Sequence, residues 1–173
     1  MSRLLFVGSS IFEAWAGVAG VAPGHVVINR AVGGTTTRDW VARLPAVLES
    51  EAPGAVGLYA GSNDLNNNVP AGVILENLSR CRALVGALPL AYFGIIKAPQ
   101  KEGRWELIDE LNCRAAVLLR GTDLYADPND IYFRDGRPVG AYFLEDGLHL
   151  TPEAYARMTD WARPLVLRWL GAA

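Results

Sequence analysis

The sequence contains few cysteines and no excess of one charge, and each shortage excludes a class of protein. Only two cysteines occur, Cys81 and Cys113, with no CxxC pair and no nearby histidine, so neither a zinc site nor a disulfide framework is indicated. We expect both to be small buried side chains. The 16 basic and 18 acidic residues nearly balance and are mixed along the chain, which argues against a nucleic-acid partner.

Long apolar runs and cofactor motifs are also missing. No apolar run approaches the roughly 18 residues of a membrane span, and the opening segment MSRLLFVGSS has too short an apolar stretch for a signal peptide. We therefore expect a cytoplasmic protein without a membrane span. The patterns GxxxxGK[ST], GxGxxG after a strand, and HExxH do not occur, so the sequence implies no nucleotide cofactor and no catalytic metal.

The 173 residues, 51% of them hydrophobic, are typical of one globular domain, which we expect to span residues 1–173. Short apolar runs alternate with segments of helical periodicity, a pattern that indicates βαβ units and a parallel sheet. Predicted strands cover residues 4–7, 25–28, 56–59, 90–96 and, more weakly, 123–126. Predicted helices cover residues 11–16, 37–48, 69–88 and 104–119, before a last helix. The predicted fold is an α/β, three-layer α/β/α sandwich with a mainly parallel, flavodoxin-like sheet of about five strands.

The last helix has a clear start. Thr151 can cap it, and Pro152 suits its first position because the missing N–H would be unpaired there in any case. Pro164 is expected to kink or interrupt this helix. Predicted loops include residues 98–103 and 128–140.

Small and polar residues follow the predicted strands at their carboxyl ends, where ligands bind in an open parallel sheet. They are Ser9 and Ser10 after the first strand, Gly33 and Gly34 after the second, and Asn63 after the third. In isolation these residues are typical of helix caps, of a turn and of an Asx turn. Together they suit an oxyanion, because the Ser10 amide, the Gly34 N–H and the Asn63 side chain can all donate.

A serine hydroxyl becomes a nucleophile only beside a base, and His149 is the candidate base. Asp146 precedes it by three residues in Asp-Gly-Leu-His, so a tight turn lets the carboxylate accept from Nδ1 and leaves Nε2 free. Alone, such a pair is more often a surface contact, and the other histidine, His25, is expected at the surface or a sheet edge. With Ser10 as partner, the set favours acyl transfer.

Four segments resemble the successive blocks of the SGNH, or GDSL-type, hydrolase family. They are residues 6–11 (FVGSSI), 29–35 (NRAVGGT), 61–64 (GSND) and 146–150 (DGLHL). Their order and spacing also match, over nearly the whole chain, and the chain looks like the compact single-domain members related to platelet-activating-factor acetylhydrolase. Each block is loose by itself, but the ordered set is specific.

The resemblance implies a serine hydrolase in which Ser10 is the nucleophile, His149 the base and Asp146 the residue that orients it. The implied oxyanion hole consists of the Ser10 amide, Gly34 and Asn63. Ser9 stands where the family usually has Asp, which leaves Ser9 as an alternative nucleophile. The alignment and the exit of the first strand favour Ser10.

The expected reaction is hydrolysis of small or short-chain acyl esters through an acyl-enzyme intermediate. The short chain leaves no room for a cap domain, so an open site is predicted. An acetylesterase, a lipase-like enzyme and a thioesterase are all compatible with the sequence. The candidates for lining the substrate site are Phe12, Trp15, Trp40 and Leu148. The alternative is a non-catalytic module that binds a glycan or an acyl group on the same scaffold. The charged loop at residues 98–104 is a rim or a mobile flap.

Overall fold

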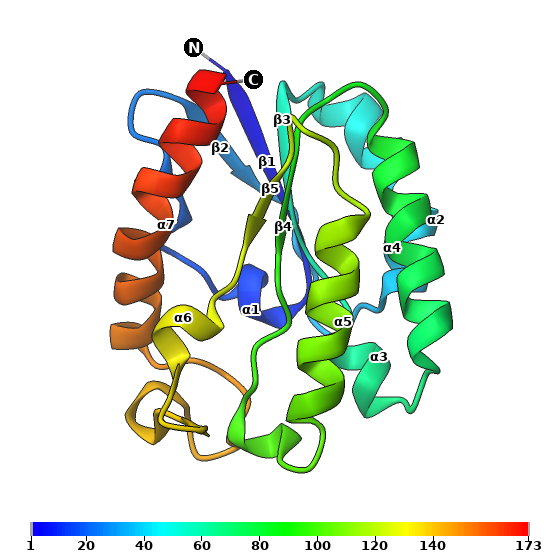
Figure 1. Cartoon of the computed structure of the whole chain (residues 1–173). Helices are drawn as coiled ribbons and strands as arrows, with labels where there is room; N and C mark the ends of the chain where they lie inside the picture. Colours follow the sequence, from blue (N-terminus) through cyan, green and yellow to red (C-terminus); the bar gives the residue numbers. More distant parts are fainter. Residues whose placement is uncertain (1, 173) are drawn as a thin grey trace.

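Five parallel strands form the central sheet, in the order β2-β1-β3-β4-β5 (Figure 1). The computed structural model describes residues 2–172. The strands are β1 (Arg3–Gly8), β2 (Val26–Asn29), β3 (Ala55–Tyr59), β4 (Leu90–Phe93) and β5 (Leu124–Ala126). Every pairing within this sheet is parallel. The predicted flavodoxin-like α/β fold is confirmed, and the strand order reverses between β1 and β3, where such sheets bind ligands.

Helices cover both faces of the sheet. The α-helices are α1 (Ser10–Glu13), α2 (Thr37–Glu51), α3 (Ser62–Asn66), α4 (Ala71–Val85), α5 (Trp105–Val117), α6 (Asn129–Tyr132) and α7 (Pro152–Ala172). The 3-10 helices are η1 (Val18–Val21), η2 (Pro99–Lys101) and η3 (Gly140–Tyr142). Helix α7 lies on one face of the sheet, with α1 and η1, whereas α2, α4 and α5 lie on the other (Figure 1).

The alternation of side chains along β1 divides the core into two layers. Leu4 and Phe6 pack toward α7, and Leu5 and Val7 pack toward α2 and α4. All four side chains are at most 1% exposed, because β1 lies between β2 and β3 in a sheet that is covered on both faces. The start of β1 and the end of α7 lie at one end of the molecule, and the carboxyl ends of the strands lie at the other (Figure 1).

An aromatic cluster fixes α1 against the sheet. The rings of Phe12 and Trp15 lie 5.4 Å and 5.7 Å from that of Phe6, and the ring of Phe12 lies 5.1 Å from that of Phe93. The Trp15 indole N–H donates to Thr159 Oγ1 on α7 at 2.8 Å. The short helix that follows β1 is therefore held by the sheet and by the last helix.

Several predicted details are wrong. Strand β4 ends at Phe93 rather than at residue 96, because the backbone of Ile95 bonds to the side chain of Asn112 instead of a neighbouring strand. Pro164 does not interrupt α7, because it lies on the exposed side of the helix, where water can replace the lost hydrogen bond; the predicted kink stays a prediction. Cys81 is buried as predicted, but Cys113 is exposed on the outer side of α5.

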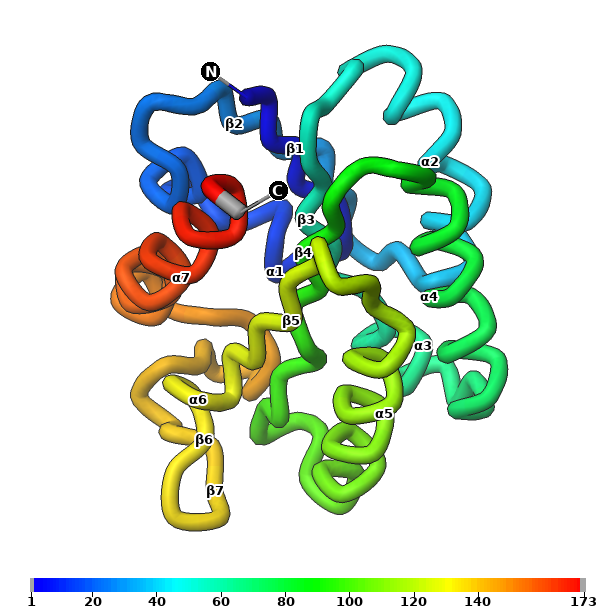
Figure 2. Tube along the Cα trace, turned by 45° about the horizontal axis from the view of Figure 1, so that its top comes forward, coloured from blue at the N-terminus to red at the C-terminus, as the bar shows by residue number. Residues whose placement is uncertain are grey.

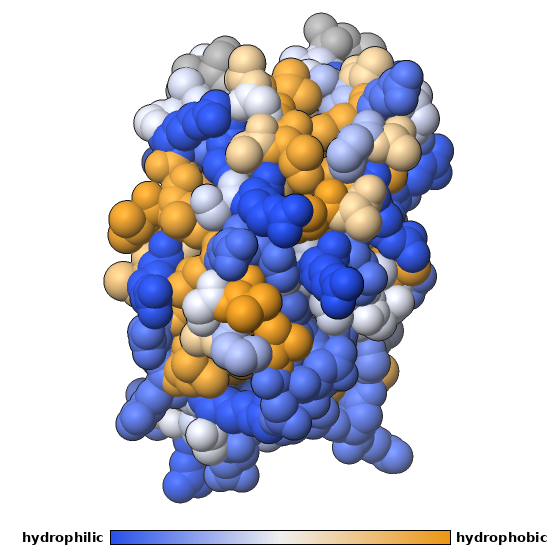
Figure 3. All heavy atoms as spheres, turned by 90° about the vertical axis from the view of Figure 1, so that its right-hand side faces the viewer, coloured by the Kyte–Doolittle hydropathy of each residue, from blue (hydrophilic) through white to orange (hydrophobic). Residues whose placement is uncertain are grey.

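The predicted loop at residues 128–140 contains structure of its own. It holds α6 and a short antiparallel hairpin of β6 (Phe133–Arg134) and β7 (Arg137–Pro138), which projects beyond α6 in Figure 2. On the face of α2 and α4, apolar side chains gather over the upper part, and the lower end is largely hydrophilic (Figure 3). No helix within residues 2–172 combines the length and apolar character that crossing a bilayer requires.

Gly8 tests the close contact between β1 and β3. Its φ is +150°, and a Cβ there would lie 2.3 Å from the Tyr59 carbonyl oxygen, a backbone atom that cannot move away. We expect Gly8→Ala to lower the free energy of unfolding by about 2–4 kcal/mol. Gly72→Ala is the matched control, because a Cβ at this position in the first turn of α4 meets open space. We expect it to raise the free energy of unfolding by at most about 1 kcal/mol. Urea unfolding of both variants measures the difference, and equal stabilities would contradict the analysis.

Candidate active site

The chain turns sharply after β1 and brings Ser10 to the carboxyl edge of the sheet. Gly8 lies close to Tyr59, and the next residue bonds to the same backbone group: the Ser9 N–H donates to the Tyr59 carbonyl at 3.2 Å. Ser9 is 2% exposed, whereas Ser10 is half-buried and begins α1. The turn therefore directs the second serine, and not the first, toward the surface.

Ser10, His149 and Asp146 form a continuous chain of hydrogen bonds. The Ser10 Oγ lies 3.0 Å from Nε2 of His149, and Nδ1 of the same ring lies 2.5 Å from Asp146 Oδ2. The structure thus brings together residues that lie 139 positions apart in the sequence. A carboxylate on Nδ1 favours the tautomer that carries its proton there, which leaves the Nε2 lone pair facing the hydroxyl.

The turn that carries Asp146 and His149 is fixed by its own hydrogen bonds. Asp146 Oδ1 accepts from the N–H groups of Leu148 and His149, each at 2.9 Å, and Gly147 has a φ of +66° that permits this turn. The hydrogen bond from the imidazole, followed by those two backbone N–H groups, lowers the pKa of Asp146 to about 2. The carboxylate therefore stays ionised well into the acidic range, below the pH at which an ordinary aspartate is protonated.

The predicted oxyanion donors lie on two neighbouring loops. Asn63, at the start of α3, donates from Nδ2 to the Thr35 carbonyl at 2.9 Å, which ties its amide to the loop of Gly34. Gly34 has a φ of +75°, and the space where a Cβ would stand is open. Within residues 2–172, neither the Gly34 N–H nor the Ser10 N–H donates to another group of the chain. Both N–H groups are therefore available to a ligand.

Buried polar residues that the sequence did not single out hold these two loops together. The Asp64 carboxylate, 1% exposed, accepts from the Thr37 N–H at 2.9 Å and from its Oγ1 at 2.6 Å. Thr35 Oγ1 accepts from the Trp40 indole at 3.0 Å and donates to the Val32 carbonyl at 2.7 Å, with the Gly8 carbonyl also in reach at 3.2 Å. Asp64 stands in the GSND segment, but the sequence gives no sign of its partner on α2.

The aromatic candidates for the substrate surface lie elsewhere. Phe12, Trp15 and Trp40 are each 1% exposed, and this burial assigns their rings to the core rather than to a surface that a substrate touches. Trp40 is linked to the loop of Gly34 through the hydrogen bond from its indole to Thr35 Oγ1. Leu148 is half-buried in the turn beside His149 and remains next to the candidate site.

An apolar hollow of about 560 Å³ lies between the end of α1 and helix α7. Its lining residues are Ala14, Ala16, Gly17, Leu144, Leu150, Pro152, Tyr155, Ala156 and Thr159. Ser10, Gly34 and Asn63 are not among them, so the hydroxyl does not line this hollow. Among residues 2–172, no group of three or more His, Cys, Asp and Glu side chains is arranged to hold a metal ion.

A serine hydroxyl beside an imidazole, at the edge of a parallel sheet and next to free N–H donors, is the arrangement of a serine hydrolase. The sequence profile of the GDSL-like Lipase/Acylhydrolase family matches residues 7–157, and the chain belongs to this family.

Similar proteins are known from several bacteria. An arylesterase of Vibrio mimicus is 39% identical over 59 residues, which are 34% of this chain and only 30% of that protein. The structure of a GDSL-like lipase from Bacteroides thetaiotaomicron is similar with a TM-score of 0.80, at 20% identity over 96% of this chain and 88% of that chain. A psychrotrophic esterase from Pseudoalteromonas sp., inhibited by monoethylphosphonate, has a TM-score of 0.77 at 18% identity, over 99% and 100% of the two chains. At these identities the two structures support the fold.

The lowered pKa of Asp146 can be measured directly. We expect its carboxyl ¹³C resonance to titrate near pH 2, below the value of about 3.9 for an unfolded chain. The ionised carboxylate therefore favours the folded state above about pH 4, and this contribution is lost as the pH falls toward 2.

His149→Ala removes the largest cause of the shift, so the midpoint of Asp146 should rise in that variant. Asp39 is an internal control in the same spectra, because its pKa is lowered by hydrogen bonds from Thr36 and should not change. A midpoint of Asp146 that His149→Ala leaves in place would contradict the assignment.

Proposed function

We propose that the protein is a serine esterase that hydrolyses small or short-chain acyl esters. Ser10 is the nucleophile, His149 the general base and Asp146 the residue that orients it. The observation that carries the proposal is the hydrogen-bonded chain from Asp146 Oδ2 to His149 and on to Ser10 Oγ, with distances of 2.5 Å and 3.0 Å. Membership of an acylhydrolase family supports the same chemistry.

The reaction proceeds in two halves. Ser10 Oγ attacks the ester carbonyl carbon while His149 Nε2 accepts the hydroxyl proton, and the carbonyl oxygen becomes an oxyanion. The Ser10 N–H, the Gly34 N–H and the Asn63 side-chain amide donate to that oxyanion. The intermediate collapses when His149 gives its proton to the leaving alcohol, which leaves an acyl group on Ser10. Water, deprotonated by His149, then attacks this acyl group, and the acid departs as Ser10 regains its proton.

The exposure of the site supports a small acyl group. The side chains of His149 and Asp146 are 37% and 48% exposed, and the apolar hollow beside α7 is lined by residues other than Ser10. A long acyl chain gains free energy only where its methylene groups leave water, at about 0.8 kcal/mol for each CH₂ buried. An open site offers little of this gain, so chain length should confer no advantage.

Ser10→Ala tests the nucleophile. We expect it to lower the rate of p-nitrophenyl acetate hydrolysis at least about 1000-fold while circular dichroism stays unchanged, because the acyl-enzyme can no longer form. Ser9→Ala is the matched control, since that buried neighbour should leave hydrolysis intact.

A fluorophosphonate probe should label the wild type and Ser9→Ala at Ser10, and should not label Ser10→Ala. A well-folded wild type that neither hydrolyses the ester nor reacts with the probe would favour a non-catalytic module that binds a glycan or an acyl group.

The chain-length preference tests the substrate class. With p-nitrophenyl esters from acetate to decanoate, kept below their micelle concentrations, kcat/KM should be highest for the shortest chains. A steady rise of kcat/KM toward decanoate would contradict the open site and would point to the apolar hollow lined by Leu144 and Leu150 as the acyl site.

A further inference from the structure

Lys101 is a buried lysine close to the segment that carries Asn63. It is 2% exposed, and its ammonium donates to the Ser62 carbonyl at 3.1 Å, to Asn66 Oδ1 at 2.7 Å and to Gln100 Oε1 at 3.3 Å. Lysine is rarely buried to this degree. Two of its three acceptors belong to α3, one on each side of Asn63.

Lys101 lies in residues 98–104, which we call the strap. The strap also bonds to the turn of His149, because the Gln100 N–H donates to the Gly147 carbonyl at 2.9 Å. On its other side, the guanidinium of Arg104 donates to the carbonyl of Leu65 and to the side chain of Asn68. The strap thus connects the turn that carries the base to the helix that carries an oxyanion donor.

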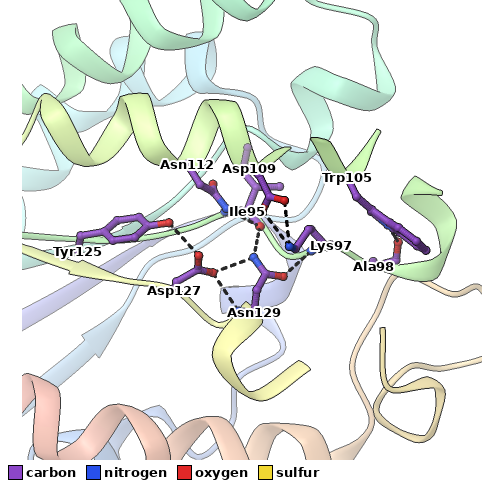
Figure 4. A network of polar contacts seen from close by, with 9 residues as sticks. All are labelled: Ile95, Lys97, Ala98, Trp105, Asp109, Asn112, Tyr125, Asp127 and Asn129. Atoms are coloured by element: carbon purple, nitrogen blue, oxygen red, sulfur yellow. Dashed lines mark hydrogen bonds and ion pairs between the residues drawn. The ribbon is translucent and has the colours of Figure 1, made fainter. Parts of the chain in front are cut away.

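Both ends of the strap are anchored (Figure 4). Before it, the backbone N–H of Lys97 donates to Asn129 Oδ1 at 2.7 Å, a bond that does not involve the Lys97 side chain. After it, the Trp105 indole donates back to the Ala98 carbonyl at 3.0 Å. These contacts tie the strap to the segments on both sides of it.

The ammonium of Lys101 is held without a carboxylate among its hydrogen-bond partners. Burial, followed by the nearby charge of Arg104, lowers the pKa of Lys101 to about 8, so the charged form still predominates at pH 7. Burying a cation without an anion is costly unless several oxygens bind it. An apolar side chain would fill this space at lower cost, so packing alone does not account for the lysine.

We propose that Lys101 is a positioning residue for Asn63. Its ammonium holds the Ser62 carbonyl and the Asn66 side chain, and thereby fixes the orientation of α3 in which Asn63 Nδ2 faces the oxyanion. The strap keeps this helix in register with the turn of His149 through Gly147. The inference rests on the proposed esterase function, and Lys101 itself touches neither substrate nor reacting atoms.

Lys101→Met removes the charge and keeps the length of the side chain. We expect kcat for p-nitrophenyl acetate to fall about 10- to 100-fold, with KM changed less than about twofold, because a misplaced donor affects the transition state most. Lys97→Met is the matched control, since that ammonium pairs with Asp109 away from α3, and its kcat should stay within about twofold. Equal losses in both variants, or no loss in Lys101→Met, would overturn the proposal.

A double-mutant cycle with Asn63→Ala separates positioning from general damage. If Lys101 acts through Asn63, the double variant should be no slower than Asn63→Ala alone, whereas independent effects multiply. Should Lys101→Met fail to fold, Asn66→Ala removes one acceptor at an exposed position and should give a smaller loss with the same lack of additivity. Multiplicative losses in both cycles would refute the inference.

A measurement independent of hydrolysis distinguishes this inference from the proposed function. The side-chain amide resonances of Asn63 should shift in Lys101→Met and stay in place in Lys97→Met. Unmoved resonances in both would refute the positioning role, even in an active enzyme. An inactive wild type whose Asn63 resonances respond to Lys101→Met would refute the esterase and retain the positioning.

Discussion

The hydrogen bond between Ser10 and His149 joins the first helix, α1, to the turn that precedes the last helix, α7. Most of the fold serves to bring these two segments together. Parallel strands all end at one edge, so the exit of β1 and the entry to α7 meet there. The aromatic cluster and the bond from Trp15 to Thr159 then hold α1 against both the sheet and α7. The distance of 3.0 Å between Ser10 Oγ and His149 Nε2, which lie 139 residues apart in the sequence, thus depends on the packing of the whole core.

Buried polar side chains set the precision of this edge. Asp64 binds Thr37 and fixes the start of α2 to α3, while Lys101 binds the other side of α3 through oxygens alone. Such groups stabilise a fold only when every donor and acceptor is paired, and in return they specify one arrangement of the loops. The candidate site is therefore partly exposed, while buried polar contacts fix the loops beneath it.

The sequence predicted the parts of this structure that depend on local pattern. Strand and helix periodicity predicted the α/β sandwich, and the four segments predicted that Ser10, His149 and Asp146 lie together, as their hydrogen bonds show. It could not separate core aromatics from surface ones, because Phe12 lies on a four-residue helix and Trp15 two residues beyond its end, and so short a segment carries no periodicity of its own. It also missed the bond of Lys101 to α3, since a charged loop is usually solvated and its burial depends on a partner 39 residues away.

The arrangement of the chain ends has a practical consequence. The start of β1 and the end of α7 lie together at the pole of the molecule opposite the strand exits (Figure 1). An added domain, an affinity tag or a solid support joined at either place would therefore stand behind the edge that carries the candidate site, and the protein could be immobilised in one orientation with that edge facing the solution.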